Sequence, residues 1–219
     1  MVIKCLLVPI ERDIMENTFV TIKEKEYSAE IVEKRSKFIA KVIKVQSEEE
    51  ATNELKKIRK EHRDARHNVF AYRIMNVGER MSDDGEPSGT AGAPILELLR
   101  GENLQNVMVV VTRYFGGILL GTGGVVRAYS SAAKDAVTTA EKVTMKLCNE
   151  YKIDTNYNYL NILTHYFKKQ SIQVRDTDFT DNICFTITVE ADRAEQVLKE
   201  IEEKTARTAI VTLKETYYQ

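Results

Sequence analysis

The sequence VVVTRYFGGILLGTGGVVRAY, residues Val109–Tyr129, places three kinds of local structure in succession. It begins within residues 107–112, a run dominated by β-branched residues that is typical of a central strand buried on both faces. Glycines crowd residues 116–124, which we expect to form a loop. Residues 125–141 are rich in alanine and predict a long helix. A buried strand, a glycine loop and a helix in this order indicate an α+β fold with unusual backbone at the end of the strand.

The chain confines its glycines to one window. All 10 lie between Gly78 and Gly124, and Pro87 and Pro94 fall in the same window. Glycine permits positive φ and close approach of the backbone to other groups. The window therefore marks the part of the chain where a ligand or another segment is expected to come close.

Composition excludes several classes of protein. The 219 residues carry 32 Lys and Arg against 33 Asp and Glu, so bulk charge does not favour coating of nucleic acid, although a local basic patch remains open. The 3 cysteines are far apart, which argues against a disulfide framework or a zinc site and for reduced thiols in the cytoplasm. No apolar run approaches the roughly 18 residues of a membrane helix, so we expect no membrane partner.

The pattern predicts two domains after an N-terminal extension, residues 1–17. In the first domain, residues 18–146, strands are expected at 18–23, 27–33, 38–45, 68–75 and 107–112, and helices at 48–62, 88–99 and 125–141. Ser47 and Glu50 have the spacing of a capping box, with Ala51, Leu55 and Ile58 facing inward.

The second domain, residues 147–219, contains neither glycine nor proline. Strands are expected at 150–155, 172–175, 183–190 and 207–216, and helices at 157–170 and 192–205, the latter capped by Asp192. A turn is expected at 176–182. The order β-α-β-β-α-β is that of a ferredoxin-like domain.

Two polar stretches could carry chemistry. The first is DARH, residues 64–67, where an acid, a cation and a histidine precede a strand; the alternative is a polar turn in which Asp64 and Arg66 pair locally. The second is SDDGEPSGTAG, residues 82–92, whose Asp83, Asp84 and Glu86 could act as a base or bind Mg²⁺. The alternative is an acidic turn that leads into a helix. We expect neither a tight metal site nor a cofactor.

The glycine loop supplies two further candidates. Arg113 and Arg127 are the only formal charges between Asn103 and Tyr129. An arginine at the end of a buried strand needs an anion, which is either a phosphate or a carboxylate of the acidic loop. Gly121-Thr122-Gly123-Gly124 leads into a helix, where free N–H groups favour anions, although a tight turn alone explains such a loop. His67 and Asp84 are the candidate acid–base residues. The full set of candidate ligand-binding residues is Asp64, Arg66, His67, Asp83, Asp84, Glu86, Arg113, Tyr114, Gly116, Gly117, Gly121, Thr122, Gly123, Gly124 and Arg127.

Together these stretches resemble the YigZ/IMPACT family. The resemblance rests on DARH at 64–67, SDDGEPSGTAGAP at 82–94 and VVVTRYFGGILLGTGGVVRAY at 109–129, and on RSKFI at 35–39. It implies an IMPACT-type first domain, similar to the second domain of a small-subunit ribosomal protein and to small-molecule kinases. It also implies a second domain similar to the last domain of elongation factor G. The chain lacks the kinases' Gly-Leu-Gly-Ser-Ser pattern, so ATP use is not expected.

The resemblance implies a link to translation, since eukaryotic relatives regulate translation through the amino-acid-starvation kinase pathway. Three hypotheses follow. In the first, the protein binds RNA, the ribosome or another anionic ligand through Arg113, Arg127 and nearby amides. In the second, it is an enzyme acting on a phosphorylated or carboxylated small molecule, with His67 or Asp84 as acid or base. In the third, it is a protein-interaction module whose motifs are architectural.

Overall fold

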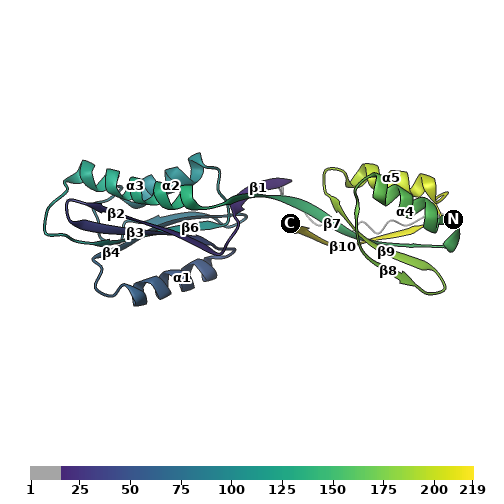
Figure 1. The fold of residues 1–219 in the computed structure, drawn as a ribbon, viewed down its shortest axis with the longest axis horizontal. Coiled ribbons are helices and arrows are strands. Elements are labelled where there is room, and N and C mark those ends of the chain that lie inside the picture. Colours follow the sequence, from purple (N-terminus) through teal and green to yellow (C-terminus); the bar gives the residue numbers. More distant parts are fainter. Residues whose placement is uncertain (1–15) are drawn as a thin grey trace. The chain divides into compact units, whose positions relative to one another are not determined.

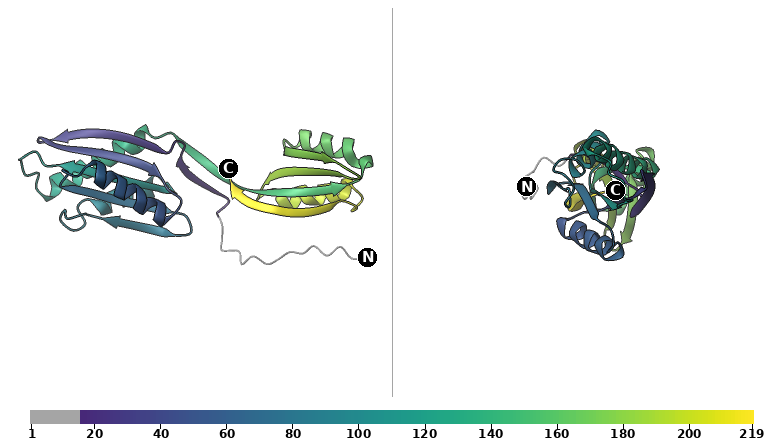
Figure 2. Two further views of the ribbon diagram at one scale, coloured as in Figure 1. Left: turned by 90° about the horizontal axis from the view of Figure 1, so that it is seen from below. Right: turned by 90° about the vertical axis from the view of Figure 1, so that its left-hand side faces the viewer.

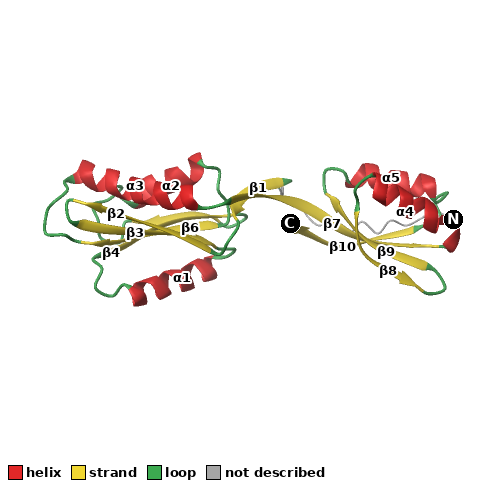
Figure 3. Ribbon diagram, viewed as in Figure 1, coloured by secondary structure: helices red, strands yellow, loops and turns green. Residues whose placement is uncertain are grey.

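A computed structural model describes residues 16–219 and shows a mixed α+β protein (Figures 1 and 3). The chain divides into two compact units. One comprises Phe19–Thr144, and the other comprises the described residues 16–18 together with Met145–Gln219. The predicted extension, residues 1–17, lies outside the described residues except for its last two positions. None of the described helices is long and apolar enough to cross a membrane.

The first unit is built on a five-stranded sheet. Its strands are β2 (Glu26–Glu33), β3 (Ser36–Lys44), β6 (Val107–Tyr114), β4 (His67–Ile74) and β5 (Gly78–Ser82), in this spatial order with all neighbours antiparallel. The central strand β6 is buried from Val107 to Arg113. The prediction of a buried central strand is therefore confirmed.

Helices cover both faces of this sheet (Figures 1 and 2). Helix α1 (Glu48–Glu61) buries Ala51, Leu55 and Ile58 on one face, and its first turn is capped by Ser47 Oγ, which accepts from the Glu50 N–H at 3.1 Å. Helices α2 (Gly92–Gly101) and α3 (Thr122–Thr139) pack on the other face. The capping box and the inward face predicted for α1 are confirmed.

Strand register gathers the glycine-bearing loops at one end of this unit. Glu33 pairs with Ser36, Lys37 with Tyr114, and Arg113 with His67. The hairpin turn after β2, the loop before β4 and the loop after β6 therefore meet, and α3 begins beside them. We call this region the glycine-rich end; it comprises residues 33–36, 62–67, 83–91 and 113–127.

The second unit is ferredoxin-like, as expected. Strands β7 (Lys142–Thr155), β8 (Gln173–Phe179), β9 (Ile183–Glu190) and β10 (Ile210–Tyr218) form an antiparallel sheet in the order β10-β7-β9-β8. Strand β1 (Thr18–Ile22), which belongs to the first unit from Phe19 on, also pairs with β7. A short 3-10 helix, Tyr157–Tyr159, precedes α4 (Leu160–Lys169), which packs with α5 (Ala194–Lys204) over one sheet face. Cys148 and Cys184 are free and buried, and Cys5 lies outside the described residues.

Two helix starts around the glycines differ from the prediction. Helix α2 begins at Gly92 rather than residue 88, because the Asp83 carboxylate accepts from the Ala91 and Gly92 N–H groups and holds the preceding residues in a turn. Helix α3 begins at Thr122 rather than residue 125. Gly121, at φ +71°, ends the loop and its carbonyl accepts the first helical hydrogen bond, from the Val125 N–H at 2.9 Å.

Other boundaries were misplaced because local signals were weak. Strand β5 was not predicted, since it is a short, exposed edge strand. The expected turn at 176–182 is narrower, because β8 continues to Phe179 in pairing with β9. Strand β7 begins at Lys142 rather than residue 150. Asp192 does not cap α5; Arg193 occupies the N-cap position with no side-chain hydrogen bond.

Candidate functional site

A buried ion pair lies at the centre of the glycine-rich end. Arg113 Nη1 donates to Glu86 Oε1 at 2.5 Å, and the two side chains are 7% and 4% exposed. Tyr129 Oη, on the fully buried Tyr129 of α3, donates to the same oxygen at 2.9 Å. Burial, and then the Glu86 charge, raises the pKa of Tyr129 far above its ordinary value, so the phenol remains a donor. Arg113 thus has the carboxylate partner that was one of its two predicted alternatives.

His67 stands beside this pair. Its Nδ1 lies 2.7 Å from the Asp84 carbonyl oxygen, and its Nε2 lies 3.7 Å from Glu86 Oε1. A carbonyl can only accept, so Nδ1 carries the proton in this contact. Gly85, at φ +90°, passes against the ring, and a Cβ there would lie 3.4 Å from it. His67 is therefore oriented by backbone on one side and faces a carboxylate on the other.

The Asp84 carboxylate fastens the acidic loop to the sheet and to α1. Its Oδ1 accepts from Arg59 Nη2 at 2.6 Å, and its Oδ2 accepts from the Asn68 N–H at 2.7 Å. Asn68 in turn accepts through Oδ1 from Thr112 Oγ1 at 2.8 Å. Both oxygens of Asp84 are therefore engaged inside the protein.

Asp83 serves the start of α2. Its carboxylate accepts from the Gly89, Ala91 and Gly92 N–H groups at 2.8, 3.0 and 2.8 Å. Burial alone would raise the pKa of Asp83, but the three backbone N–H donors outweigh burial and lower that pKa. The three acids of the loop are thus bound to partners within the first unit. Among residues 16–219, no three His, Cys, Asp or Glu side chains are placed together to hold a metal ion.

The start of α3 has the features of an anion site. Gly121 is the N-cap and offers no side-chain hydrogen bond, and the first turn contains no acidic residue. The first N–H groups of a helix have no partner within the helix, and its dipole favours anions there. Gly121, Thr122 and Gly123 are exposed, and Arg127 lies exposed one turn further along.

The loop between β6 and α3 rests on the hairpin turn between β2 and β3. A Cβ at Gly116 would lie 2.0 Å from the Arg35 backbone, so this position requires glycine, and the Gly116 N–H donates to Ser36 Oγ at 3.2 Å. Gly117, at φ +82°, has open space around it. The loop then presents Phe115, Ile118 and Leu119, which are 40%, 40% and 82% exposed.

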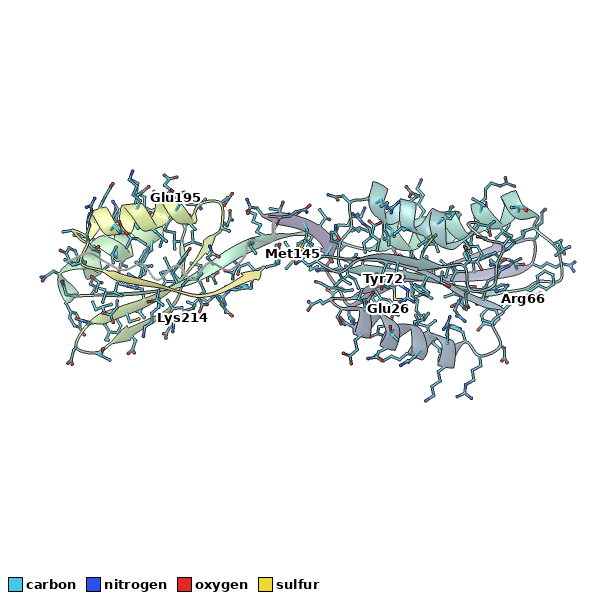
Figure 4. The ribbon with its side chains drawn as sticks, turned by 180° about the vertical axis from the view of Figure 1, so that it is seen from behind. Glu26, Arg66, Tyr72, Met145, Glu195 and Lys214 are labelled. Carbon is cyan, nitrogen blue, oxygen red and sulfur yellow. The ribbon has the colours of Figure 1, made fainter. Side chains whose placement is uncertain are left out.

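Cations without an ion pair border this loop. Among residues 16–219, Lys34, Arg35, Arg63, Arg66 and Arg127 form no salt bridge within the chain. Arg66 lies with its guanidinium 5.6 Å from the centroid of the Phe115 ring, and Figure 4 shows it at the tip of the first unit. The local pair of Asp64 and Arg66 that was one alternative is not formed, and Asp64 is exposed.

Tyr114 points away from the Arg113 cluster. Successive residues of a strand face opposite sides, and Tyr114 Oη lies 2.8 Å from His62 Nδ1 next to α1. Although His62 directly follows a charged helix, its side chain is only 11% exposed. The sequence-based candidates omitted Tyr129, Asn68, Arg59 and Phe115. Phe115 and Tyr129 had a local signal, because both lie inside the glycine motif at 109–129.

Comparison with known proteins identifies the family. The Impact N-terminal domain model matches residues 34–137. "IMPACT family member YvyE" of Bacillus subtilis is 36% identical over 178 residues, which cover 80% of this chain and 82% of that protein. The chain belongs to the IMPACT family. "Protein IMPACT" of Mus musculus is 41% identical over 98 residues, covering 42% of this chain and 30% of that protein.

A solved structure described as that of a hypothetical protein has a TM-score of 0.62 and 25% identity, and the match covers 92% of this chain and 99% of that one. All the candidate residues from Asp64 to Arg127 fall within the matched Impact N-terminal domain. The site therefore belongs to the part of the chain that IMPACT proteins share.

Proposed function

We propose that this IMPACT protein acts in translation by binding ribosomal RNA through the glycine-rich end. Family membership supports the general role, because the resemblance to the family implies a link to translation. The particular observation that supports RNA as the ligand is the distribution of charge at this end. Five exposed cations there form no ion pair within residues 16–219, whereas the acids of the loop at 83–86 are bound internally.

The unpaired charges favour an anionic partner. Five cations form no ion pair in the described chain, namely Lys34, Arg35, Arg63, Arg66 and Arg127. The neighbouring acids without an ion pair are Glu33 and Asp64. Phosphate groups attract such a surface through counterion release. The exposed amides at the start of α3 add uncharged donors to the same surface.

In this proposal Arg113 does not bind the anionic ligand, unlike in the first of the three hypotheses. Its guanidinium is buried against Glu86, so it does not reach a phosphate in this arrangement. We propose that Arg127, Arg66 and the amides of residues 122–124 contact the phosphates, and that Arg113 and Glu86 hold the loop on which they depend.

Binding to purified ribosomal subunits and to isolated ribosomal RNA, measured across a salt series, tests the proposal. The affinity is expected to fall steeply with salt, and Arg127→Ala is expected to weaken binding and reduce the slope of log affinity against log salt by about 1. Lys134→Ala is the matched control, because Lys134 is exposed on the same helix about 10 Å further from its start.

An equal loss for both variants would mean that bulk charge and not this site binds RNA. Absence of salt-sensitive binding to subunits and to RNA would refute the proposal. Binding to subunits without binding to RNA would instead favour the third hypothesis, a protein-interaction module.

The geometry of His67 favours a second candidate function. Its Nδ1 is held by the Asp84 carbonyl, which leaves Nε2 toward Glu86 as an oriented base. We propose, as the alternative, acid–base chemistry by His67 on a phosphorylated or carboxylated small molecule held at the start of α3. Incubation with pools of such metabolites, followed by mass spectrometry, should show turnover that His67→Gln abolishes while the fold is kept.

A further inference from the structure

We infer that the RNA bound at the glycine-rich end is unpaired, and that Phe115 and Leu119 contact its bases. This inference rests on the proposed function and names the kind of RNA involved. It comes from a feature that phosphate binding does not explain, which is the exposure of large apolar side chains among the cations.

Phe115 has the arrangement of a stacking residue. Its ring is 40% exposed and has two guanidiniums nearby, Arg66 at 5.6 Å and Arg113 at 5.9 Å from the ring centroid. Arg113 is fixed by Glu86, so the ring lies beside an immobile cation. Arg66 is exposed and has no ion pair within the described chain. Unpaired bases stack on aromatic rings and on arginine planes.

Leu119 and Ile118 extend this surface. They are 82% and 40% exposed in the same loop, and Val32 of β2, next to the hairpin turn on which the loop rests, is 65% exposed. A duplex presents phosphates and riboses and hides the faces of its bases, so it offers nothing to these side chains. A partner that exposes both phosphates and base faces matches cations and apolar groups together.

The loop is held in place before any ligand binds. Gly116 packs directly against the Arg35 backbone and donates to Ser36, so the residues around Phe115 are anchored to the sheet. A prearranged loop loses little conformational entropy on binding. This favours a specific contact over an incidental exposure of apolar side chains.

The second unit offers a contrasting surface. The sheet face away from α4 and α5 carries more acids than bases, namely Glu150, Asp154, Asp176, Asp178, Glu190 and Glu215 against Lys146, Lys152 and Arg175. Lys146 pairs with Glu190 and Arg175 with Glu150, which leaves the other four acids in excess. Such a face repels phosphates. Some sheets of this topology bind RNA through aromatic side chains, but the acidic charge of this face disfavours RNA. We therefore place the contacts to RNA bases at the glycine-rich end.

The test uses one fluorescent single-stranded RNA and the same strand annealed to its complement, with the full chain as binder. We expect the single strand to bind about tenfold more tightly than the duplex. Phe115→Ala should weaken single-strand binding about tenfold while Phe115→Tyr retains it. Leu119→Ala should weaken it severalfold without affecting the fold, because Leu119 is 82% exposed. Leu213→Ala, at an exposed leucine of β10 in the second unit, is the matched control.

Each result bears on the inference separately from the proposed function. Equal or tighter binding of the duplex, or single-strand binding unchanged in both Phe115→Ala and Leu119→Ala, overturns the inference and leaves the proposed function standing. Absence of salt-sensitive binding to either RNA and to ribosomal subunits overturns both. Binding to subunits alone overturns the inference in favour of a ribosomal protein as partner.

Discussion

Replacing Glu86 by glutamine should destabilise the first unit strongly. The amide keeps the shape of the side chain and an oxygen that can accept hydrogen bonds, but it removes the negative charge. Arg113, with a side chain that is 7% exposed, then stays buried without a counter-ion. Removing one partner of a buried pair costs about 3–5 kcal/mol, a large fraction of the roughly 5–15 kcal/mol that stabilises a typical domain.

Removing the whole polar cluster should cost much less than removing Glu86 alone. In a triple variant, Glu86→Leu with Arg113→Met and Tyr129→Phe, no charge and no hydroxyl of the cluster is left without a partner. Replacement of a buried pair by apolar residues of similar volume is often close to neutral. The Tyr129→Phe change is needed because the Tyr129 hydroxyl donates to Glu86, and an unpaired buried hydroxyl costs about 1–3 kcal/mol.

Hydrogen exchange of the β6 amides in residues 107–112, with urea unfolding alongside, reports on the first unit separately from the second. We expect Glu86→Gln to lower the free energy of unfolding of this unit by about 3 kcal/mol or more, and the triple variant to recover most of it. If Glu86→Gln lowers the free energy of unfolding by less than about 1 kcal/mol, the argument is refuted that the pair is excluded from water and that each charge needs the other. A triple variant less stable than Glu86→Gln would refute it equally.

Three further changes test other parts of the glycine-rich end. Asp83→Ala should lower the free energy of unfolding by about 1–2 kcal/mol at neutral pH, because it removes the cap of α2. The pKa of Asp83 is lowered in the folded state, so the stabilisation that its carboxylate provides is lost in acid. Urea titrations should therefore show the difference between Asp83→Ala and wild type shrinking below about pH 4. Gly116→Ala should lower the free energy of unfolding, measured by thermal unfolding, by more than about 2 kcal/mol, because its Cβ would meet the Arg35 backbone at 2.0 Å. Gly101→Ala is the control: a Cβ at Gly101 would lie in open space, so this change should be neutral or stabilising. Gly123→Ala should fold normally, since its Cβ would meet only Arg127 Nη1 at 3.5 Å. Filter binding should nevertheless show a weaker affinity for ribosomal RNA, because the added methyl group lies beside the free amides at the start of α3. Unfolding of this variant would contradict the expectation and favour an architectural role for the loop.

Sequence patterns were informative where burial alone decides structure. The β-branched run at 107–112 predicted a central strand, and the strand is buried because helices cover both faces of its sheet. Helix starts were less predictable, since α2 depends on Asp83, which lies eight or nine residues before the N–H groups that it caps. Helix propensity depends on neighbouring residues and therefore cannot predict such a contact.

The partner of Arg113 illustrates the same limit within the site. The sequence allowed Asp83, Asp84, Glu86 or a phosphate, and no local pattern separates them. The fold does, because Asp83 is committed to the start of α2 and Asp84 to Arg59 and the Asn68 N–H, which leaves Glu86 for the arginine. Tyr129 was missed as a site residue for a similar reason, since only the packing of α3 on the sheet brings it to Glu86.

These internal contacts also decide whether an anion can be bound beside an acidic loop. Free carboxylates next to the start of α3 would repel phosphate and cancel the nearby cations. Here the charge of Glu86 is balanced by Arg113 and that of Asp84 by Arg59, while backbone N–H groups solvate Asp83. The acids therefore shape the loop without dominating the field outside it, and Arg66 and Arg127 face the solvent as net positive charge. The three carboxylates are therefore compatible with the proposed anion site, because each is paired or hydrogen-bonded within the first unit.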